Sequence, residues 1–169
     1  MKKLNFIFIT LLFVAFSASS QSRKKADKDT EEWRYELEVV QQGHEGSYLV
    51  KVWSYSKKAN VAIEQAKKNA IHGIIFRGVS ASGRVPGQPA LTNNPNLEME
   101  KQEFFDDFFA DGGKYMKFVQ VSGDGSVAAE DRLKVGKEYK IGVVLSINVE
   151  GLRNDLQATG MIKSLSSGF

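Results

Sequence analysis

The segment from Tyr139 to Val149 alternates apolar and polar residues, and this pattern constrains the fold more than any other feature of the chain. A period of two places successive side chains on opposite faces of a β-strand. The apolar side chains that share one face are Tyr139, Ile141, Val143, Leu145, Ile147 and Val149. The opposite face carries Lys140, Gly142, Ser146 and Asn148. The segment therefore predicts a strand in a sheet with one buried face and one mostly polar face.

Two earlier segments have the same period and predict an antiparallel hairpin. The first begins at Trp33 and places Tyr35, Leu37 and Val39 on one face. The second covers residues 48–55 and follows a polar loop. Its two faces carry Tyr48, Val50 and Val52 on one side, and Leu49, Lys51, Trp53 and Tyr55 on the other. Alternating runs joined by a short polar loop are typical of paired strands.

Residues 60–76 predict the clearest helix of the chain. Asn60 is expected to be its N-cap, because an asparagine side chain accepts a backbone N–H of the first turn. Gly78 is expected to end it. The stripe that faces the core at spacings of three and four consists of Ile63, Ala66, Ala70 and Ile74. Its small alanines indicate a close approach to a sheet.

A second helix is predicted over residues 97–110, with Gly112 and Gly113 as its terminator. Four phenylalanines on it, at helical spacings, are expected to enter the core: Phe104, Phe105, Phe108 and Phe109. The segment 79–97 between the two helices contains all three prolines of the chain. A loop of this length is usually a functional flap or a mobile insertion.

The remaining elements complete an α+β domain. Strands are expected at 115–121 and 127–135, joined through a turn at 123–125, and a short helix is expected within 152–165. The order β-β-α-α-β-β-β predicts an antiparallel sheet with two helices packed on one face. A single domain is expected over residues 33–165, preceded by a flexible charged leader at 22–32.

The first 21 residues have the pattern of a removable secretory signal peptide. Lys2 and Lys3 precede an apolar run from Leu4 to Phe16, which is too short to span a bilayer comfortably. Small residues follow at 17–20, where a signal peptidase would cleave. No second apolar run of sufficient length follows, so no transmembrane segment is expected in the mature chain. The protein is therefore predicted to be periplasmic or secreted.

Composition argues against several classes of function. The chain has 23 basic and 20 acidic residues, and removing Lys2 and Lys3 with the signal leaves 21 minus 20, a net charge of +1. This balance argues against nucleic-acid binding, which needs a concentrated basic surface. Cysteine is absent, which excludes disulfides, thiolate metal sites and a cysteine nucleophile.

No catalytic or metal-binding motif is found around the two histidines, His44 and His72. They do not form a His-x-x-x-His or His-Glu-x-x-His pattern, so a helical zinc site is excluded. Ser80 and Ser82 do not lie in a Gly-x-Ser-x-Gly elbow. We therefore assign no catalytic residue and no metal ligand.

The acidic cluster of Asp106, Asp107 and Asp111 is best explained as a solvated helix face. The stretch from Ser122 to Ser126 resembles part of a calcium loop but lacks the remaining spaced oxygen ligands, and it predicts a turn. No nucleotide-binding glycine motif is present. No cofactor is expected.

Three segments resemble the LPP20-like domains and the flagellar-assembly FlgT N-terminal group of small bacterial envelope domains. They are YLVKVWSYS from residue 48, NVAIEQAKKNAIHGI from residue 60 and YKIGVVLSINV from residue 139. The resemblance covers roughly residues 33–150 and rests on apolar and small residues. The SASSQ stretch at 17–21 resembles the cleavage regions of exported Bacteroidetes proteins. The resemblance implies an accessory or assembly domain without catalysis, although this chain has no cysteine to carry the lipid of many such proteins.

Two classes of function follow from the sequence. The first is a noncatalytic exported module that binds an envelope protein or another copy of itself, with Lys51, Trp53 and Tyr55 in the contact surface. The alternative for these side chains is coverage by the segment 152–165 of the same chain. The second class is a small hydrolase or ligand-binding enzyme with a cleft gated by the loop 79–97. A histidine within hydrogen-bond reach of a carboxylate or serine in a pocket would favour it.

Overall fold

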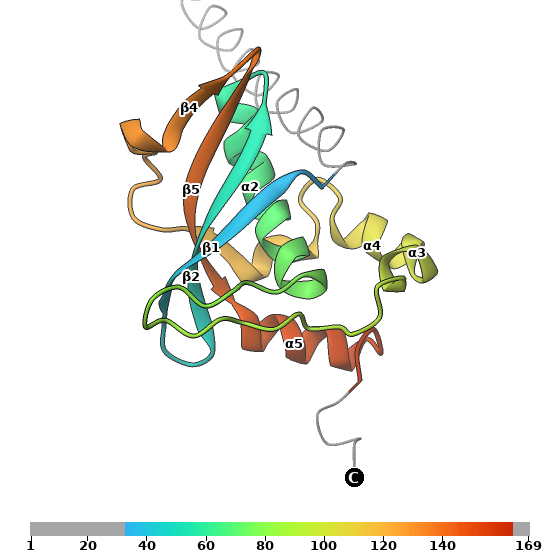
Figure 1. Ribbon diagram of the computed structural model, residues 1–169. Coiled ribbons are helices and arrows are strands. Elements are labelled where there is room, and N and C mark those ends of the chain that lie inside the picture. The colour runs from blue at the N-terminus through green and yellow to red at the C-terminus, as the bar shows by residue number, and fades with distance from the viewer. Residues whose placement is uncertain (1–32, 164–169) are drawn as a thin grey trace, which may run out of the picture.

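An antiparallel sheet of five strands forms the centre of the computed structural model, which describes residues 33–163 (Figure 1). The strands are β1 (Tyr35–Gln42), β2 (Ser47–Ser56), β3 (Val119–Val121), β4 (Arg132–Val135) and β5 (Glu138–Asn148). Their order is β1-β2-β5-β3, and β4 also pairs with β5. The predicted signal peptide and leader lie outside the described residues. The α+β class and the antiparallel sheet are confirmed.

The central pair, β2 and β5, follows the alternation of the sequence. The two strands pair from Ser47 opposite Asn148 to Ser56 opposite Tyr139. The buried side chains at the middle of this pair include Val50, Val52, Ile141, Val143, Leu145 and Ile147, each at most 2% exposed. Tyr139 was expected on the buried face but is 37% exposed, because it lies at the end of the strand, beyond most of the core.

The helix α2 (Ala59–Phe76) packs on β2 and β5 along the buried face. Ala66 and Ala70 are fully buried there, which confirms the close approach that the small side chains predicted. At Gly73 the helix also contacts β1, and a Cβ atom at this position would overlap the side chain of Leu37. Close packing of α2 therefore depends on small residues along its length.

The start of α2 differs from the prediction. The N-cap is Lys58, and Asn60 lies inside the first turn. The backbone N–H of Lys58 faces the hydroxyl oxygen of Ser56 at 3.4 Å, so the turn into the helix begins directly after β2.

The far end of α2 stops at Gly78, as predicted, and is closed by the loop 79–97. Gly78 has a φ of +71°, a left-handed conformation that glycine adopts at low cost. The backbone N–H groups of Leu91 and Thr92 donate to the carbonyls of Ile74 and Ile75. Because the last carbonyls of a helix have no partner within it, these bonds attach the loop to the helix end.

The second predicted helix is divided into two short ones, α3 (Leu97–Glu100) and α4 (Gln102–Phe108). Lys101, with φ −122° and ψ 35°, interrupts the helix between them. The interruption lets Leu97 enter the core and Glu98 reach α2, while α4 buries Phe105 and Phe108. The prediction of one continuous helix over 97–110 is therefore wrong.

Both predicted strands after α4 are shorter than expected. Short 3₁₀ helices, η1 (Lys114–Phe118) and η2 (Ala129–Asp131), occupy part of each segment before β3 and β4. The turn between them is confirmed, because Asp124 Oδ1 accepts the backbone N–H of Ser126 at 2.9 Å. It does not form a hairpin, however, since β3 and β4 pair separately with the two ends of β5.

The helix α5 (Val149–Ala158) begins directly after β5 and closes the lower end of the core (Figure 1). Val149, expected as the last strand residue, is its first residue, because the Asn148 side chain accepts the N–H of Gly151 and starts the helix. Leu152 and Leu156 are fully buried. Within residues 33–163, no helix is both long and apolar enough to cross a membrane.

Candidate functional site

His72 lies at the centre of a buried group of aromatic and polar side chains beside α2. The side chain of this residue is stacked on Trp33, with ring centroids 3.7 Å apart, and lies 4.7 Å from the ring of Phe76. Its Nδ1 is 2.6 Å from the hydroxyl of Tyr35, and its Nε2 is 3.2 Å from Oε2 of Glu98. The residue is only 4% exposed. Both ring nitrogens are therefore engaged within the fold.

The partners of His72 determine its tautomer when the ring is neutral. The carboxylate of Glu98 can only accept, so Nε2 carries the hydrogen and donates it. Nδ1 is then an acceptor, and the hydroxyl of Tyr35 donates to it. Burial lowers the pKa of His72, while the hydrogen bond to Glu98 opposes this shift. Burial also raises the pKa of Tyr35 well above its usual value. The side chains of Tyr35, His72 and Glu98 thus form a continuous series of hydrogen bonds, called here the relay, in which both nitrogens of His72 have a partner.

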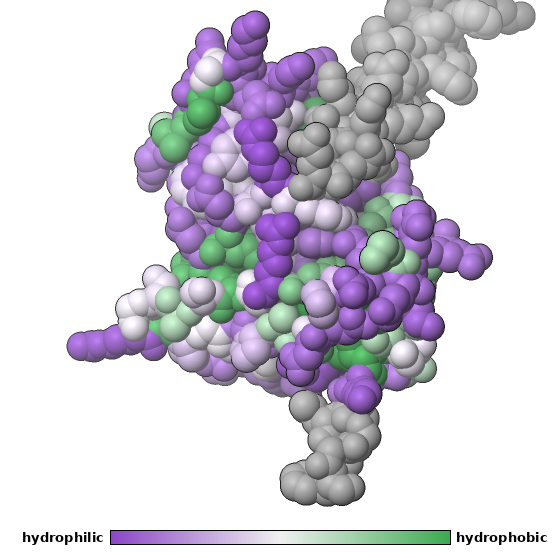
Figure 2. Space-filling model, turned by 45° about the vertical axis from the view of Figure 1, so that its right-hand side comes forward, coloured by the Kyte–Doolittle hydropathy of each residue, from purple (hydrophilic) through white to green (hydrophobic). Residues whose placement is uncertain are grey.

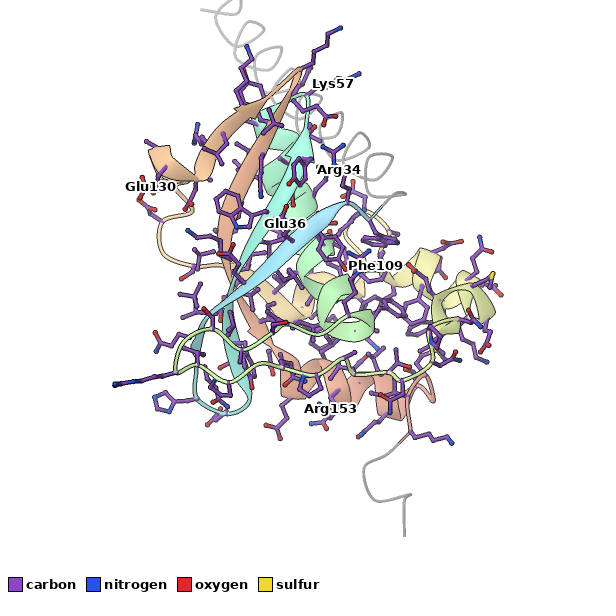
Figure 3. The ribbon with its side chains drawn as sticks, in the orientation of Figure 1. Arg34, Glu36, Lys57, Phe109, Glu130 and Arg153 are labelled. Atoms are coloured by element: carbon purple, nitrogen blue, oxygen red, sulfur yellow. The ribbon has the colours of Figure 1, made fainter. Side chains whose placement is uncertain are left out.

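A pocket of about 680 Å³ lies next to this relay. Figure 3 shows Phe109, one of its lining residues, near α2 and α4. The aromatic and apolar part of the lining is Trp33, Pro95, Met99, Phe105, Phe109 and Ala110. The polar part is Lys68, Asn96, Glu98, Gln102, Asp106 and Asp111. The pocket therefore combines aromatic walls with charged groups of both signs.

Lys68 is the most buried charged group of this lining, with 5% of the residue exposed. Burial lowers its pKa to about 8, and the negative charge of Asp111 opposes the shift. Its Nζ also lies 5.9 Å from the centre of the Tyr115 ring. Lys68 therefore keeps much of its charge at neutral pH and loses it more readily than an exposed lysine.

A second candidate surface is the face of the sheet opposite α2, called here the open face. It carries the predicted contact residues Lys51, Trp53 and Tyr55, which are half-buried. The segment 152–165 was the expected alternative cover, but within the described part of it α5 packs into the core through Leu152 and Leu156. Whether the three predicted residues contact a partner stays a prediction.

Carboxylates of β1 hold the two aromatic rings on the open face. Trp53 Nε1 donates to Glu38 at 3.0 Å, and the Tyr55 hydroxyl donates to Glu36 at 2.6 Å. Glu36 also accepts from Lys140 at 2.7 Å, and these donors lower the pKa of its carboxyl group. The rings are thereby fixed by their polar atoms.

Cationic side chains lie over the same two rings. The guanidinium of Arg34 is 4.2 Å from the centre of the Tyr55 ring, and Lys140 Nζ is 5.0 Å from that of Trp53. Figure 3 shows Arg34 and Glu36 close together at the start of β1. The indole of Trp53 lies directly on Gly142, where a Cβ atom would come within 2.9 Å of it. The open face is therefore an ordered array of aromatic, cationic and acidic groups.

Two of the remaining sequence candidates, Asp106 and Asp111, line the pocket. The others lie apart from the pocket and from the open face. His44 is exposed in the turn between β1 and β2, and Ser80 and Ser82 are exposed in the loop 79–97. Asp106, Asp107 and Asp111 are exposed, as expected for solvated groups. They do not share one helix face, however, because α4 ends at Phe108.

Sequence reasoning missed the pocket and most of its polar lining. Trp33, Lys68, Glu98 and Asp111 come from four separate segments, so no spacing in the sequence connects them. One signal was present: a histidine and a lysine on the same helix, both outside the stripe of small residues that packs on the sheet. Comparison with protein-family models, curated proteins and solved structures finds no match to this chain.

Proposed function

We propose that this chain is a noncatalytic accessory or assembly module of the cell envelope, exported by its signal peptide, that binds a protein through the open face. The partner is an envelope protein or a second copy of the chain. The observation that carries the proposal is the pair of half-buried rings, Trp53 and Tyr55, held in fixed positions outside the core. The resemblance to small envelope domains is in keeping with it.

The composition of the open face fits a protein contact. Tryptophan, tyrosine and arginine are the residues most enriched among those that dominate binding energy. Here Trp53 and Tyr55 lie on the same face of β2, and Arg34 lies over the Tyr55 ring. Hydrogen bonds to Glu36 and Glu38 fix both rings before a partner arrives. A surface that is already ordered loses less conformational entropy on binding.

The arrangement of His72 favours a noncatalytic function. A general base needs a nitrogen that can take a proton from a substrate, but Tyr35 and Glu98 occupy both nitrogens of His72. The ring also lies between Trp33 and Phe76 and is almost fully buried. The relay meets the criterion of a histidine next to a carboxylate beside a pocket, but its geometry supports a structural role.

The test compares the wild-type protein with Trp53→Ala and with Met99→Ala, a control at a residue that is 72% exposed on α3. Each protein, carrying the same tag, is used to capture envelope proteins, and its association state is measured by sedimentation. The proposal expects Trp53→Ala to lose a captured protein or the dimer, while Met99→Ala keeps it. Circular dichroism verifies that each variant is folded.

A second variant decides the matter if Trp53→Ala does not fold. Tyr55→Ser removes the neighbouring ring without uncovering Gly142, so the fold is expected to survive. If this variant, or a folded Trp53→Ala, retains the same captured proteins and the same association state as the wild type, the open face is not the contact surface and the proposal fails.

A further inference from the structure

The pocket beside α2 has no role in protein binding through the open face, because it lies on the α2 side of the sheet. Four segments contribute to it: Trp33 two residues before β1, the helix α2, the end of the loop 79–97, and the region of α3 and α4. Its volume of about 680 Å³ lies within the range of pockets that bind small molecules. Half of its described lining residues are apolar or aromatic, with Trp33, Phe105 and Phe109 as the aromatic ones, and the other half are polar or charged. Small-molecule sites likewise combine apolar contact with polar groups that fix the orientation of the ligand.

His72 holds two of the lining residues in place. The indole of Trp33 stacks on its ring, and the carboxylate of Glu98 accepts its Nε2 hydrogen. The backbone of Trp33 has a φ of +43°, an unfavourable conformation for a tryptophan, and its carbonyl accepts a hydrogen bond from Arg77 at 3.1 Å. An aromatic plane and a carboxylate are therefore fixed on one wall of the pocket before any ligand enters.

Negative charges outnumber positive charges in the lining of the pocket. Among the described lining residues there are three carboxylates, those of Glu98, Asp106 and Asp111, and one ammonium group, that of Lys68. Aromatic faces attract cations through their quadrupole, and carboxylates attract them directly. We propose that this pocket binds a small organic cation carrying an ammonium group, with Glu98 as its counter-ion and Trp33 as its aromatic wall.

Removal of the Lys68 charge tests whether the pocket prefers a cation or an anion. The ammonium group of Lys68 competes with a bound cation for the carboxylates of the pocket. Asp111 and Tyr115 interact with it, and Glu98 and Asp106 line the same pocket. Removal of the lysine charge is therefore expected to tighten the binding of a cation. If the pocket were made for an anion, the same change would weaken binding.

The probe is choline, and its uncharged analogue 3,3-dimethylbutan-1-ol has nearly the same shape. The chain contains two tryptophans, so Trp53→Phe leaves Trp33 as the only one, and its fluorescence reports on the pocket. Saturation-transfer NMR of the choline methyl groups provides a readout that does not depend on fluorescence. We expect choline to bind saturably and at least about fivefold more tightly than the alcohol.

Three variants on this background test the named groups. Glu98→Gln keeps an acceptor for His72 but removes the charge, and should weaken choline binding by about fivefold or more without affecting the alcohol. Glu103→Gln removes the same charge from an exposed position of α4 outside the pocket and should change little. Lys68→Gln should strengthen choline binding.

A capped lysine amide is compared with choline as a second ligand. The comparison shows whether the pocket prefers a free amine or the lysine side chain of a polypeptide. Preference for the lysine derivative supports the same chemistry with a protein as its source, and preference for choline supports a free amine. The proposal is overturned if neither compound binds in either readout, if the alcohol binds as tightly as choline, or if Glu98→Gln and Glu103→Gln have equal effects. Weaker choline binding in folded Lys68→Gln would also overturn it.

Discussion

The two faces of the sheet hold their side chains in different ways, although the same strands supply both. On the buried face, which α2 covers and which is called here the covered face, Val50, Val143 and Leu145 are packed in the core and need no polar partner. On the open face, Trp53 and Tyr55 keep their positions through carboxylates of the neighbouring strand. The alternation of a strand therefore predicts which side chains are buried, whereas the polar partners of the other side chains depend on how the strands are aligned with their neighbours.

Apolar surface outside the core is also distributed unevenly. Leu133 and Val135 of β4 are 44% and 49% exposed, and Figure 2 shows hydrophobic surface at the upper left, at the end of the molecule where β4 lies. The same view shows further hydrophobic patches left of the middle and at the lower right, separated by hydrophilic residues. The covered face is therefore the part of the sheet where packing should determine stability.

The largest effect is expected on the covered face. Leu145 is fully buried at the centre of β5, and its truncation to alanine should lower the free energy of unfolding by about 2–5 kcal/mol through lost burial and the cavity left behind. Chemical denaturation measures this change. A loss below about 1 kcal/mol would show that the covered face is less tightly packed than its burial indicates.

A smaller loss is expected at the edge of the covered face, where packing and hydrogen bonding meet. Tyr35→Phe keeps the ring but leaves Nδ1 of the buried His72 without its donor. An unsatisfied buried acceptor costs about 1–3 kcal/mol, which denaturation of the variant would detect. Phe76→Leu, at the other side of the same imidazole, provides a packing control that leaves both hydrogen bonds in place.

The pH dependence of stability should come from the same residue. Burial lowers the pKa of His72 in the folded protein, whereas the unfolded chain retains a value near 6.5. The contribution is therefore complete above pH 6.5 and is lost as the pH falls through the folded pKa, because the unfolded chain binds the proton more readily. Denaturation midpoints measured stepwise from pH 7.5 to about 5 should decline in the wild type and decline less in His72→Gln. Equal slopes would assign the pH dependence to other groups.

The smallest effect is expected on the open face. Lys140→Ala removes an ion pair with Glu36 and the cation above Trp53, but this pair is exposed to solvent. Exposed pairs contribute about 0–1 kcal/mol, so the melting temperature should change by only a few degrees. A cost equal to that of Leu145→Ala would mean that the open face contributes to stability as much as the core does.

Elements whose apolar residues recur at a regular spacing could be predicted from the sequence. The alternation of residues 139–149 and of residues 48–55 predicted two central strands and the faces of most of their side chains. The prediction failed only at the ends of the later strand, where Tyr139 is exposed and Val149 begins α5. The alanines of α2 predicted its approach to the sheet. These patterns are local, because each depends only on neighbours along one strand or helix turn.

Elements that depend on distant contacts were not predictable in the same way. The short helix η1 contains Tyr115 and Phe118, residue types that suit a strand, so tertiary packing overrides local preference there. The short helix η2 consists of Ala129, Glu130 and Asp131, which are depleted in strands, so the predicted strand was too long at its start. The interruption at Lys101 could not be read from the phenylalanine spacing either. The pocket requires Trp33, Glu98 and Lys68 to meet, and only the folded chain brings them together.

The position of β5 has a consequence for the time course of folding. This strand lies in the middle of the sheet, yet it follows all the other strands in the sequence, and its partners in β2 are roughly 80–100 residues earlier. The hairpin of β1 and β2 can form early, but α2 has no complete surface to pack on until β5 arrives. Such distant pairings slow folding, because the loop between the strands must close before their contacts form. A ribosome would therefore have to complete most of the chain before the core could assemble, and a shortened chain that ends before residue 138 should remain largely unfolded.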